Sequence, residues 1–369
     1  MILTLLKLNN FRNYRFLDFR PEKSLNIIRG ANAQGKTNLL ESIHHLSTTR
    51  PLRATKENEL ISWGENSAIV SGEVMRDSGV DTSLEIALSS EERKQVRING
   101  MLRPRVIDLF GNLNTVTFSA QDLGLVRGEP AERRRFMDLE IAQIRPSYVT
   151  CLAHFRRALA QRNELLKRHA EGNGPLTCLE AWDEQIVRYG AQMMEMRWEF
   201  IKRLSPLADD AHQRLTEGVE TFRVTYHPNV QPSEDMNWAQ AYEEQLETKR
   251  NQEIRIGRTL VGPQRDDVAL FVNEKEVRTY GSQGQQRTAV LSLKLAEAQL
   301  AQEEVGEPPV VLLDDVMSDL DAARRAKVMS FLTGNTQVFI TCTDLASFSD
   351  EMISQAALFT VEEGQICRD

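Results

Sequence analysis

Cysteines and long apolar segments are scarce in this chain of 369 residues. Its four cysteines are widely separated, form no CxxC pair and have no histidine at metal-ligand spacing, which argues against a disulfide scaffold and a zinc module. A reducing cytoplasm suits such a chain. The apolar stretch at residues 1–8 is interrupted by Thr4 and Lys7 and followed by a polar run, so we expect neither a signal peptide nor a membrane span.

Positive charge is also in deficit overall, since the formal net charge is −8. Taken alone, the negative net charge argues against binding to nucleic acid, because binding to phosphates needs concentrated positive potential. The distribution is uneven, however, and residues 133–168 hold nine basic and three acidic side chains, a local charge of +6. An acidic protein can thus present one basic face.

Strand-like segments fill the first third of the chain, long helices follow, and strands return toward the C-terminus. The hydrophobic content of 41% is ample for one large or two moderate domains. From about residue 129 to residue 215, apolar residues at helical spacing predict long helices, punctuated by Pro146, the 172–175 cluster and Pro206. Strands are predicted at residues 3–8, 16–19, 25–28, 68–75, 82–88, 95–98, 221–226, 267–272, 310–313 and 338–341. Helices predicted at 284–302 and 322–332 alternate with the last two strands, which indicates a parallel sheet.

The segment 30–37, with the sequence GANAQGKT, follows an apolar strand and precedes a helix-like run. This is the pattern of a phosphate-binding loop, whose glycines let successive backbone N–H groups point at phosphate oxygens. Lys36 would reach the β- and γ-phosphates, and the Thr37 hydroxyl would ligate Mg²⁺. We expect nucleotide contacts from Gly30, Asn32, Gly35, Lys36, Thr37 and Asn38.

An apolar run over residues 309–313 ends in two acids, Asp314 and Asp315, as expected of a buried parallel strand that delivers carboxylates to the edge of a sheet. Asp314 would hold Mg²⁺ through water, and Asp315 would orient or deprotonate an attacking water. Roughly 280 residues separate Lys36 from Asp314, yet both must meet one nucleotide. The two ends of the chain must therefore build a single domain, with the helical region inserted between them.

A third motif, YGSQGQQR at residues 280–287, leads into a long predicted helix. It resembles the signature motif of ABC-type ATPases, a second anion-binding helix start at which Ser282, Gly284 and Gln285 could meet a γ-phosphate. One nucleotide does not ordinarily touch both helix starts of one subunit in this class, so a partner subunit would supply the second one. ATP would then join two heads. The alternative is a turn that merely caps the helix.

Seven motifs in order make the chain resemble the RecF family, bacterial recombination-mediator ATPases related to SMC-type heads without the long coiled coil. They are residues 8–14 (LNNFRNY), 30–37, 50–61 (RPLRATKENELI), 118–128 (FSAQDLGLVRG), 132–138 (ERRRFMD), 262–267 (GPQRDD) and 280–287. The implied fold is α/β: an ABC/SMC-type P-loop ATPase head of mixed and parallel sheets at residues 1–125 and 260–369. A mainly helical arm, lobe II, would be inserted at residues 126–259.

The resemblance implies an ATP-dependent DNA-binding protein of recombinational repair and replication, with weak, DNA-stimulated ATPase activity. ATP and Mg²⁺ would be its cofactors, and a homodimer formed with ATP would grip duplex, gapped or junction DNA without sequence specificity. RecO and RecR would be its partners in loading RecA, and no membrane would be involved. Two alternatives stay open, a transport-type ABC ATPase subunit and a P-loop kinase.

The same resemblance supplies further site residues. Gln121 stands where a Q-loop glutamine would ligate Mg²⁺, while Arg12 and Arg53 are expected at phosphate or ribose, with structural ion pairs as the alternative. The switch position, usually histidine in transporters, falls among Thr341, Cys342 and Thr343. For the DNA backbone we expect contacts from basic residues of the arm, the first three of which could instead form a solvated helix face: Arg133, Arg134, Arg135, Arg156, Arg157 and Lys167.

Overall fold

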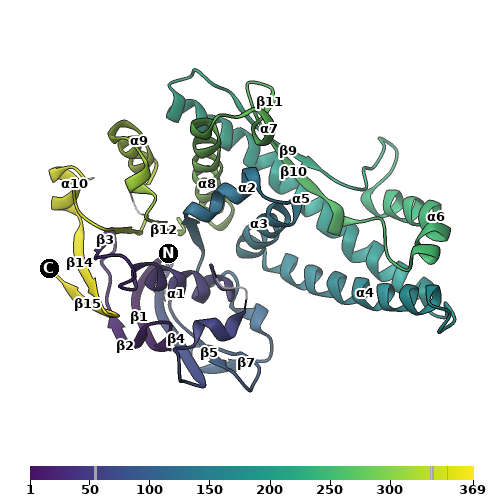
Figure 1. The fold of residues 1–369 in the computed structure, drawn as a ribbon, viewed down its shortest axis with the longest axis horizontal. Coiled ribbons are helices and arrows are strands. Elements are labelled where there is room, and N and C mark those ends of the chain that lie inside the picture. The colour runs from purple at the N-terminus through teal and green to yellow at the C-terminus, as the bar shows by residue number, and fades with distance from the viewer. Residues whose placement is uncertain (54–55, 333, 335, 347) are drawn as a thin grey trace. The chain divides into compact units, whose positions relative to one another are not determined.

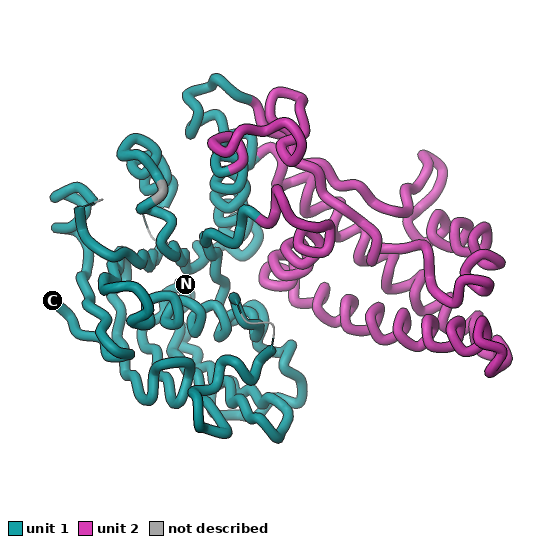
Figure 2. The backbone as a smooth tube through the Cα atoms, in the orientation of Figure 1, with its two compact units in different colours: residues 1–123, 207–220, 287–369 teal, residues 124–206, 221–286 magenta. Residues whose placement is uncertain are grey.

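The computed structural model describes residues 1–53, 56–332, 334, 336–346 and 348–369, and the chain forms two compact units (Figure 2). Unit 1 comprises residues 1–123, 207–220 and 287–369, and unit 2 comprises residues 124–206 and 221–286. Unit 2 differs from the expected arm at 126–259: it also includes residues 124–125 and 260–286, and residues 207–220 belong to unit 1. Ala54 and Thr55, part of the 50–61 motif, lie outside the described residues.

Unit 1 contains two six-stranded sheets. The first is antiparallel, in the order β2-β1-β4-β5-β6-β7. Its strands are β1 (Ile2–Phe11), β2 (Tyr14–Phe19), β4 (Ser67–Met75), β5 (Asp81–Ser89), β6 (Gln95–Ile98) and β7 (Met101–Arg103). The alternation of buried and exposed residues along β4 is typical of a sheet with one face in the core.

The second sheet of unit 1 has the order β15-β14-β3-β13-β12-β8 and is parallel except for β15. Its strands are β3 (Leu25–Arg29), β8 (Thr115–Phe118), β12 (Val310–Asp314), β13 (Val338–Cys342), β14 (Ala357–Glu362) and β15 (Gln365–Arg368). Figure 1 shows the consequence of this order: the C-terminal strand β14 lies beside the N-terminal strand β3. Both ends of the chain therefore build this sheet.

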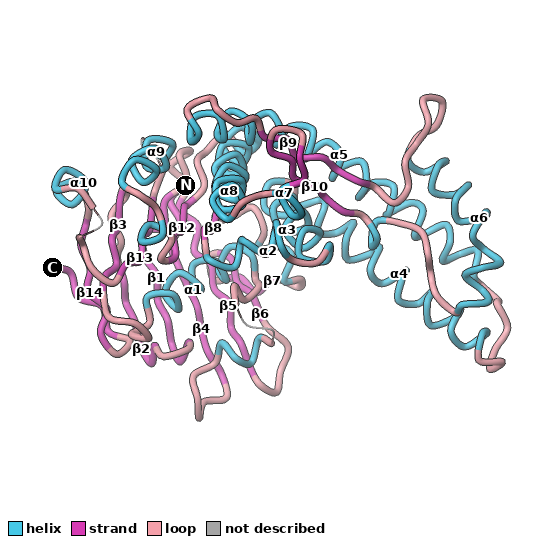
Figure 3. Tube along the Cα trace, turned by 45° about the horizontal axis from the view of Figure 1, so that its top comes forward, coloured by secondary structure: helices cyan, strands magenta, loops and turns pink. Residues whose placement is uncertain are grey.

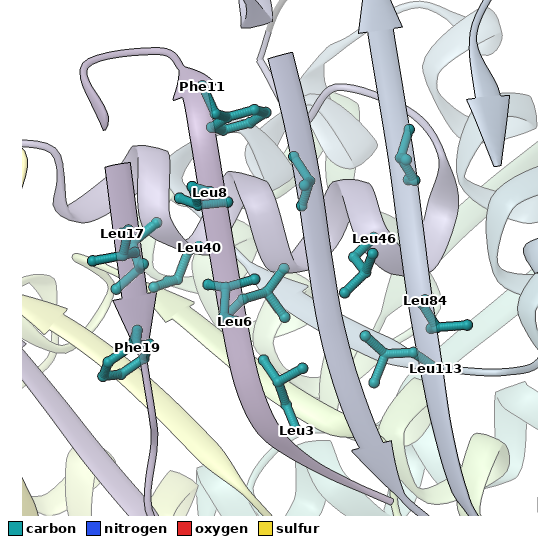
Figure 4. Packing of buried hydrophobic residues seen from close by; sticks show 14 of the residues in the cluster. Leu3, Leu6, Leu8, Phe11, Leu17, Phe19, Leu40, Leu46, Leu84 and Leu113 are labelled. Carbon is teal, nitrogen blue, oxygen red and sulfur yellow. The ribbon is translucent and has the colours of Figure 1, made fainter. Parts of the chain in front are cut away.

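Helix α1 (Lys36–Thr48) packs its apolar side chains against both sheets of unit 1. Leu40 and Leu46 of this helix lie among Leu6 and Leu8 of β1 in one buried cluster (Figure 4). A second cluster covers the other face of the parallel sheet and includes residues of α9 (Ala322–Leu332) and α8 (Gln283–Val305). Strand β12 contributes alternate residues to the two clusters, which explains its unbroken apolar run.

Unit 2 combines helices with the three-stranded antiparallel sheet β11-β10-β9 (Figure 3). Its elements are α2 (Gly124–Arg127), α3 (Pro130–Ile144), α4 (Pro146–Ala170), β9 (Phe222–His227), α6 (Trp238–Ile256), β10 (Asp267–Val272), β11 (Lys275–Glu276) and α7 (Val277–Tyr280). A buried ionic cluster is built around Arg197, which bonds to Asp138 at 2.7 Å and Asp266 at 2.8 Å. The GPQRDD motif thus contributes to the internal structure of this unit.

Helices α5 (Leu179–Thr216) and α8 each contribute residues to both units. Pro206 lies inside α5 and does not end it, so the interruption that its position suggested is absent from this helix. The short helix α10 (Asp350–Gln355) completes unit 1, with Ser349 as its N-terminal cap. Within the described part of the chain, no helix combines the length and the apolar character needed to cross a bilayer.

Candidate nucleotide-binding site

The phosphate loop lies between β3 and α1, as the sequence predicts. Gly30 and Gly35 bound the loop, and their backbone φ angles are 158° and 120°. A Cβ atom on Gly30 would lie 2.4 Å from the carbonyl oxygen of Val361, and one on Gly35 would lie 2.5 Å from Asn13 Nδ2. Gly30 requires glycine because a backbone carbonyl fills the space of a side chain, and Gly35 favours glycine because of its φ angle.

Lys36 begins α1, and its ammonium group folds back over the loop. Nζ donates hydrogen bonds to the carbonyl oxygens of Gly30 at 2.7 Å and Ala31 at 2.9 Å. Asn32 is exposed on the same loop. Among the described residues, no side chain caps the N-terminus of α1, and no acidic residue lies in its first turn. One ammonium group and several backbone donors thus gather at a point suited to a phosphate group.

Asp314 ends β12 with its carboxylate almost fully buried beside α1. Its Oδ1 atom accepts hydrogen bonds from Thr37 Oγ1 at 2.8 Å and from Thr341 Oγ1 at 3.0 Å. Its Oδ2 atom forms an ion pair with Arg53. The structure therefore brings together Thr37 and Asp314, the two residues that the sequence assigns to the metal.

The donor set at this point fits Mg²⁺, which prefers hard oxygen ligands such as hydroxyl and carboxylate groups. Thr37 and Asp314 supply one of each. Gln121 follows β8, which pairs in parallel with β12, so it lies at the carboxyl edge of the same sheet. Its side chain is exposed. Magnesium bound to these oxygens would neutralise negative charge on the phosphates of a nucleotide.

Asp315 points differently from its neighbour Asp314. Its φ angle is 56°, and its side chain is exposed at the end of β12. The backbone N–H of Asp315 donates to Thr341 Oγ1 at 2.9 Å, and its Oδ1 atom accepts from Ser318 Oγ at 3.1 Å. This left-handed conformation turns one carboxylate outward while the other stays buried, which suits the two different roles that the sequence predicts for them.

Arg12 and Arg53 both form the ion pairs that the sequence leaves open as an alternative. Arg12 Nε lies 2.9 Å from Glu41 Oε2, and Glu41 Oε1 accepts from the backbone N–H groups of Leu52 and Arg53 at 3.1 Å. The guanidinium group of Arg53 pairs with Asp314. Glu41 thus ties two of the family motifs together beside the loop. Contacts of these arginines with phosphate or ribose stay predictions.

Two residues of the LNNFRNY segment hold the phosphate loop and are absent from the predicted set. Asn13 Nδ2 donates to the carbonyl oxygen of Gln34 at 2.8 Å, and Asn13 Oδ1 accepts from Asn38 Nδ2 at 2.8 Å. The hydroxyl of Tyr14 donates to the carbonyl oxygen of Gly35 at 3.0 Å, and burial raises the pKa of this hydroxyl. The available signal was an asparagine in the turn between two predicted strands, followed directly by a tyrosine at the start of the second strand.

The three switch candidates differ in their surroundings. Thr341 is buried, and its hydroxyl lies between Asp314 and the backbone of Asp315. Burial raises the pKa of the Cys342 thiol to about 11. Thr343 is exposed, with Oγ1 3.5 Å from Asp344 Oδ2. Of the three, only Thr341 has hydrogen bonds to the acidic pair among the described contacts.

The signature segment lies at the N-terminus of α8. The backbone N–H of Gln285 donates to Ser282 Oγ at 3.2 Å, and the backbone N–H of Ser282 donates to Gln285 Oε1 at 2.9 Å. This reciprocal pair is a capping box, so the capping role considered as the alternative is present. Ser282 and Gly284 are nevertheless exposed, and a Cβ on Gly284 would meet no atom closer than 3.9 Å.

The basic residues of the arm separate into two sets. Arg133 is buried, and its guanidinium forms two bonds to Asp267, at 2.7 and 2.9 Å. Its assignment to DNA is therefore wrong, because a buried, paired guanidinium cannot reach a phosphate. Arg134 is half-buried, donates to the carbonyl oxygen of Asp266 at 2.8 Å, and has its pKa lowered by burial.

The other four arm residues are exposed: Arg135, Arg156, Arg157 and Lys167. Arg156 lies 3.1 Å from Asp138 Oδ2, and Lys167 lies 4.0 Å from Glu171 Oε1 on the same helix. The carboxylate of Asp138 is buried, whereas both partners of the Lys167–Glu171 pair are exposed, and an exposed pair contributes little to stability. Contacts of these four residues with the DNA backbone stay predictions.

The chain matches, over residues 2–366, the family model described as RecF/RecN/SMC N terminal domain. It is 39% identical over 365 residues to the DNA replication and repair protein RecF of Oceanobacillus iheyensis, with 98% of each chain covered. It is 41% identical over 372 residues to the protein of the same name from Heliobacterium modesticaldum, with 100% of this chain and 99% of the relative covered.

Comparison with solved structures points to the same family as the comparison of sequences. The recombination mediator protein RecF with ATP, from the RecFOR pathway, is similar with a TM-score of 0.92 and 31% identity, covering 100% of this chain and 97% of that one. An Smc head domain from Pyrococcus furiosus has a TM-score of 0.56 at 16% identity, which shows a shared fold. The predicted ABC/SMC-type α/β head is thereby confirmed, and the chain belongs to the RecF family.

Proposed function

We propose that this protein is an ATP-dependent DNA-binding protein of recombinational repair and replication. The observation that carries the proposal is the meeting of Thr37 and Asp314 at 2.8 Å beside the phosphate loop. The two residues come from opposite ends of the chain, and their hydrogen bond supports a nucleotide site at this point. Support also comes from the relatives, which are named DNA replication and repair proteins, and from a solved structure of one with ATP.

In this proposal each group at the site has one task. The loop amides and Lys36 bind the phosphates, and Thr37 with Asp314 would hold Mg²⁺. Asp315 is exposed and would orient water or accept its proton, which is the only step of acid–base chemistry required here. Hydrolysis would be slow and would act as a switch.

Dimerisation is the second part of the proposal. The exposed start of α8, with Ser282 and Gly284, offers backbone donors to the nucleotide of a second copy. ATP would thus close two heads, and the exposed basic residues of the arm would then hold duplex DNA near gaps or junctions through its phosphates. We propose RecO and RecR as partners in loading RecA, since a similar solved protein is described as part of the RecFOR pathway.

We also propose a cytoplasmic location. All four cysteines are free thiols in the structure, two of them exposed, as expected in a reducing compartment. The transport and kinase alternatives do not fit membership of the RecF family, and no described contact favours either of them.

The proposal is tested by DNA binding with and without nucleotide. Binding of fluorescent gapped DNA is measured by anisotropy for the wild-type protein and for Lys36→Met, each with ATP and Mg²⁺. ATP is expected to tighten binding by the wild-type protein and to leave the variant unchanged. Equal DNA affinity with and without ATP in the wild-type protein would contradict the proposal.

A further inference from the structure

Gln34, in the middle of the phosphate loop, is held by two tight turns from opposite ends of the chain. The turn between β1 and β2 provides Asn13, whose Nδ2 donates to the carbonyl oxygen of Gln34 at 2.8 Å. Asn13 also accepts a hydrogen bond from Asn38 at the start of α1. The loop and the helix that follows it are thereby joined to the N-terminal hairpin.

The second turn, Glu363–Gly364, joins β14 to β15 near the C-terminus. The backbone N–H of Glu363 donates to Gln34 Oε1 at 2.7 Å, and that of Gly364 donates to the carbonyl oxygen of Gln34 at 3.1 Å. The same hairpin lies against the other end of the loop, where the carbonyl oxygen of Val361 leaves no room for a Cβ on Gly30. The C-terminal hairpin therefore contacts the loop at two places.

The two turns also touch each other. A Cβ on Gly364 would lie 2.4 Å from the carbonyl oxygen of Asn13 and 3.2 Å from its carbonyl carbon. Both of these are backbone atoms, which cannot rotate away as the end of a side chain can. The position of the C-terminal turn is thus fixed against the N-terminal turn, with the loop between them.

We infer that the β14–β15 hairpin is a positioning element of the nucleotide site, and that Gln34 is the positioning residue through which it acts. A phosphate loop binds by presenting backbone N–H groups in fixed directions. If a loop becomes ordered only when the ligand binds, the loss of conformational entropy lowers the affinity for the ligand. Contacts that hold the loop in its binding conformation beforehand avoid this loss. The inference rests on the proposed function, because it concerns the affinity for ATP.

Two glycines of the chain form a matched pair for testing this inference. Gly364 has a φ angle of 74° in its hairpin turn, and Gly100 has a φ angle of 75° in the turn between β6 and β7. Alanine is strained by the same backbone conformation at both positions. A Cβ on Gly100 would meet no atom within 4 Å, whereas one on Gly364 would push the turn away from Asn13 and Gln34.

The experiment measures the dissociation constant for ATP with Mg²⁺ by calorimetry on the full chain, for the wild-type protein, Gly364→Ala and Gly100→Ala. The melting temperature without nucleotide is measured for all three. We expect Gly364→Ala to weaken ATP binding by about tenfold, as the loss of two hydrogen bonds would, while Gly100→Ala keeps the wild-type affinity. Both variants are expected to melt at lower temperature, since both are strained.

A second variant, Gln34→Leu, removes the side-chain acceptor and keeps the backbone of the loop. It is expected to weaken ATP binding several-fold on its own. Combined with Gly364→Ala, it should add less than its separate effect, because both changes break the same contact. If Gly364→Ala does not fold, Gln34→Leu decides the question by itself.

The outcomes separate this inference from the proposed function. Unchanged ATP affinity in Gly364→Ala and in Gln34→Leu, with a wild-type protein that binds ATP, overturns the positioning role alone. Equal weakening by Gly364→Ala and Gly100→Ala also overturns it, because strain would then explain the loss. A wild-type protein that binds no ATP overturns the proposed function and this inference with it.

Discussion

The hydroxyl of Thr37 donates a hydrogen bond to the carboxylate of Asp314 over 2.8 Å, which joins the first turn of α1 to the end of β12. Parallel pairing of β3 with β13, and of β13 with β12, brings these two residues to one edge of the sheet. The same order brings the C-terminal hairpin against the phosphate loop. The order of strands in the sheet thus brings together residues that lie far apart in the sequence.

Lys36→Met is expected to weaken ATP binding by at least about a hundredfold. The ammonium group is the only charge that the loop itself offers, and charge-assisted hydrogen bonds are each worth about 1.5–3 kcal/mol. Calorimetric titration with ATP measures the change, and circular dichroism verifies that the variant is folded. ATP affinity within a factor of two of the wild-type value would remove Lys36 from the site.

Asp315→Asn is expected to separate hydrolysis from binding. The exposed carboxylate of Asp315 makes no contact with the loop among the described hydrogen bonds, so ATP affinity should stay unchanged. Release of phosphate should fall by about a hundredfold or more, as on loss of a general base. Glu351→Gln, which changes an exposed carboxylate on α10, is the control and should hydrolyse ATP at the wild-type rate. Unimpaired phosphate release by Asp315→Asn contradicts its assigned role.

Arg133→Ala and Lys167→Ala are expected to act on different properties. Loss of Arg133 leaves Asp267 without its buried partner, so the free energy of unfolding should fall by about 1–3 kcal/mol. Burial alone would raise the pKa of Asp267, but hydrogen bonds from Arg133 and from the Val268 N–H lower it. Urea denaturation measures the loss, and a stability equal to that of the wild-type protein would refute this burial argument.

Lys167→Ala should leave stability within about 0.5 kcal/mol of the wild-type value, because its partner is an exposed glutamate. It should instead reduce the slope of log affinity for DNA against log salt concentration by about 0.9, the amount for one phosphate contact. Titrations of duplex DNA at several salt concentrations measure the slope. Arg133→Ala is the matched comparison, and its slope should equal that of the wild-type protein.

Burial of His45 is expected to make the stability of the protein depend on pH. Burial, and then the charge of Lys94, lower the pKa of His45 to about 3, so the folded protein keeps this imidazole neutral. The unfolded chain binds a proton at an ordinary pKa of about 6.5. Because the unfolded state then holds more protons, this term destabilises the protein as pH falls from about 6.5 toward 3, by about 1.4 kcal/mol per pH unit.

His45→Leu is expected to remove that term. Urea denaturation at pH 7.5 and pH 5.5 gives the change in the free energy of unfolding for the wild-type protein and for the variant. The change should be smaller in the variant by about 1.4 kcal/mol. Equal changes in the two proteins would show that His45 does not carry the pH dependence.

Much of the parallel sheet could be predicted because its central strands are buried on both faces. Such strands appear as unbroken apolar runs, as in residues 310–313, and the loops after them carry polar residues of recognisable type. The strands β8, β14 and β15 were not predicted. Strand β8 is only four residues long, and the C-terminal hairpin has a weak alternation with charged residues.

The residues expected to bind phosphate and magnesium could be predicted from the sequence. The residues that hold the phosphate loop in place could not. Lys36, Thr37 and Asp314 belong to motifs whose residue types are dictated by phosphate and magnesium. The side chains of Asn13 and Gln34 form hydrogen bonds to backbone groups of neighbouring turns, and any of several polar residues could make such bonds. Arg133 was predicted at a surface that it does not occupy. Three successive arginines suggest a basic surface, yet the first of them is buried on helix α3 and paired with Asp267.

Dimerisation driven by ATP is the central claim, and light scattering tests it most directly. The molar mass is measured with ATP and Mg²⁺ for the wild-type protein, for Ser282→Arg and for Gln299→Arg, an exposed position further along α8. The wild-type protein and Gln299→Arg should double in mass, whereas Ser282→Arg should remain a monomer that still binds ATP. The same mass for all three proteins, either monomer or dimer, would contradict the account.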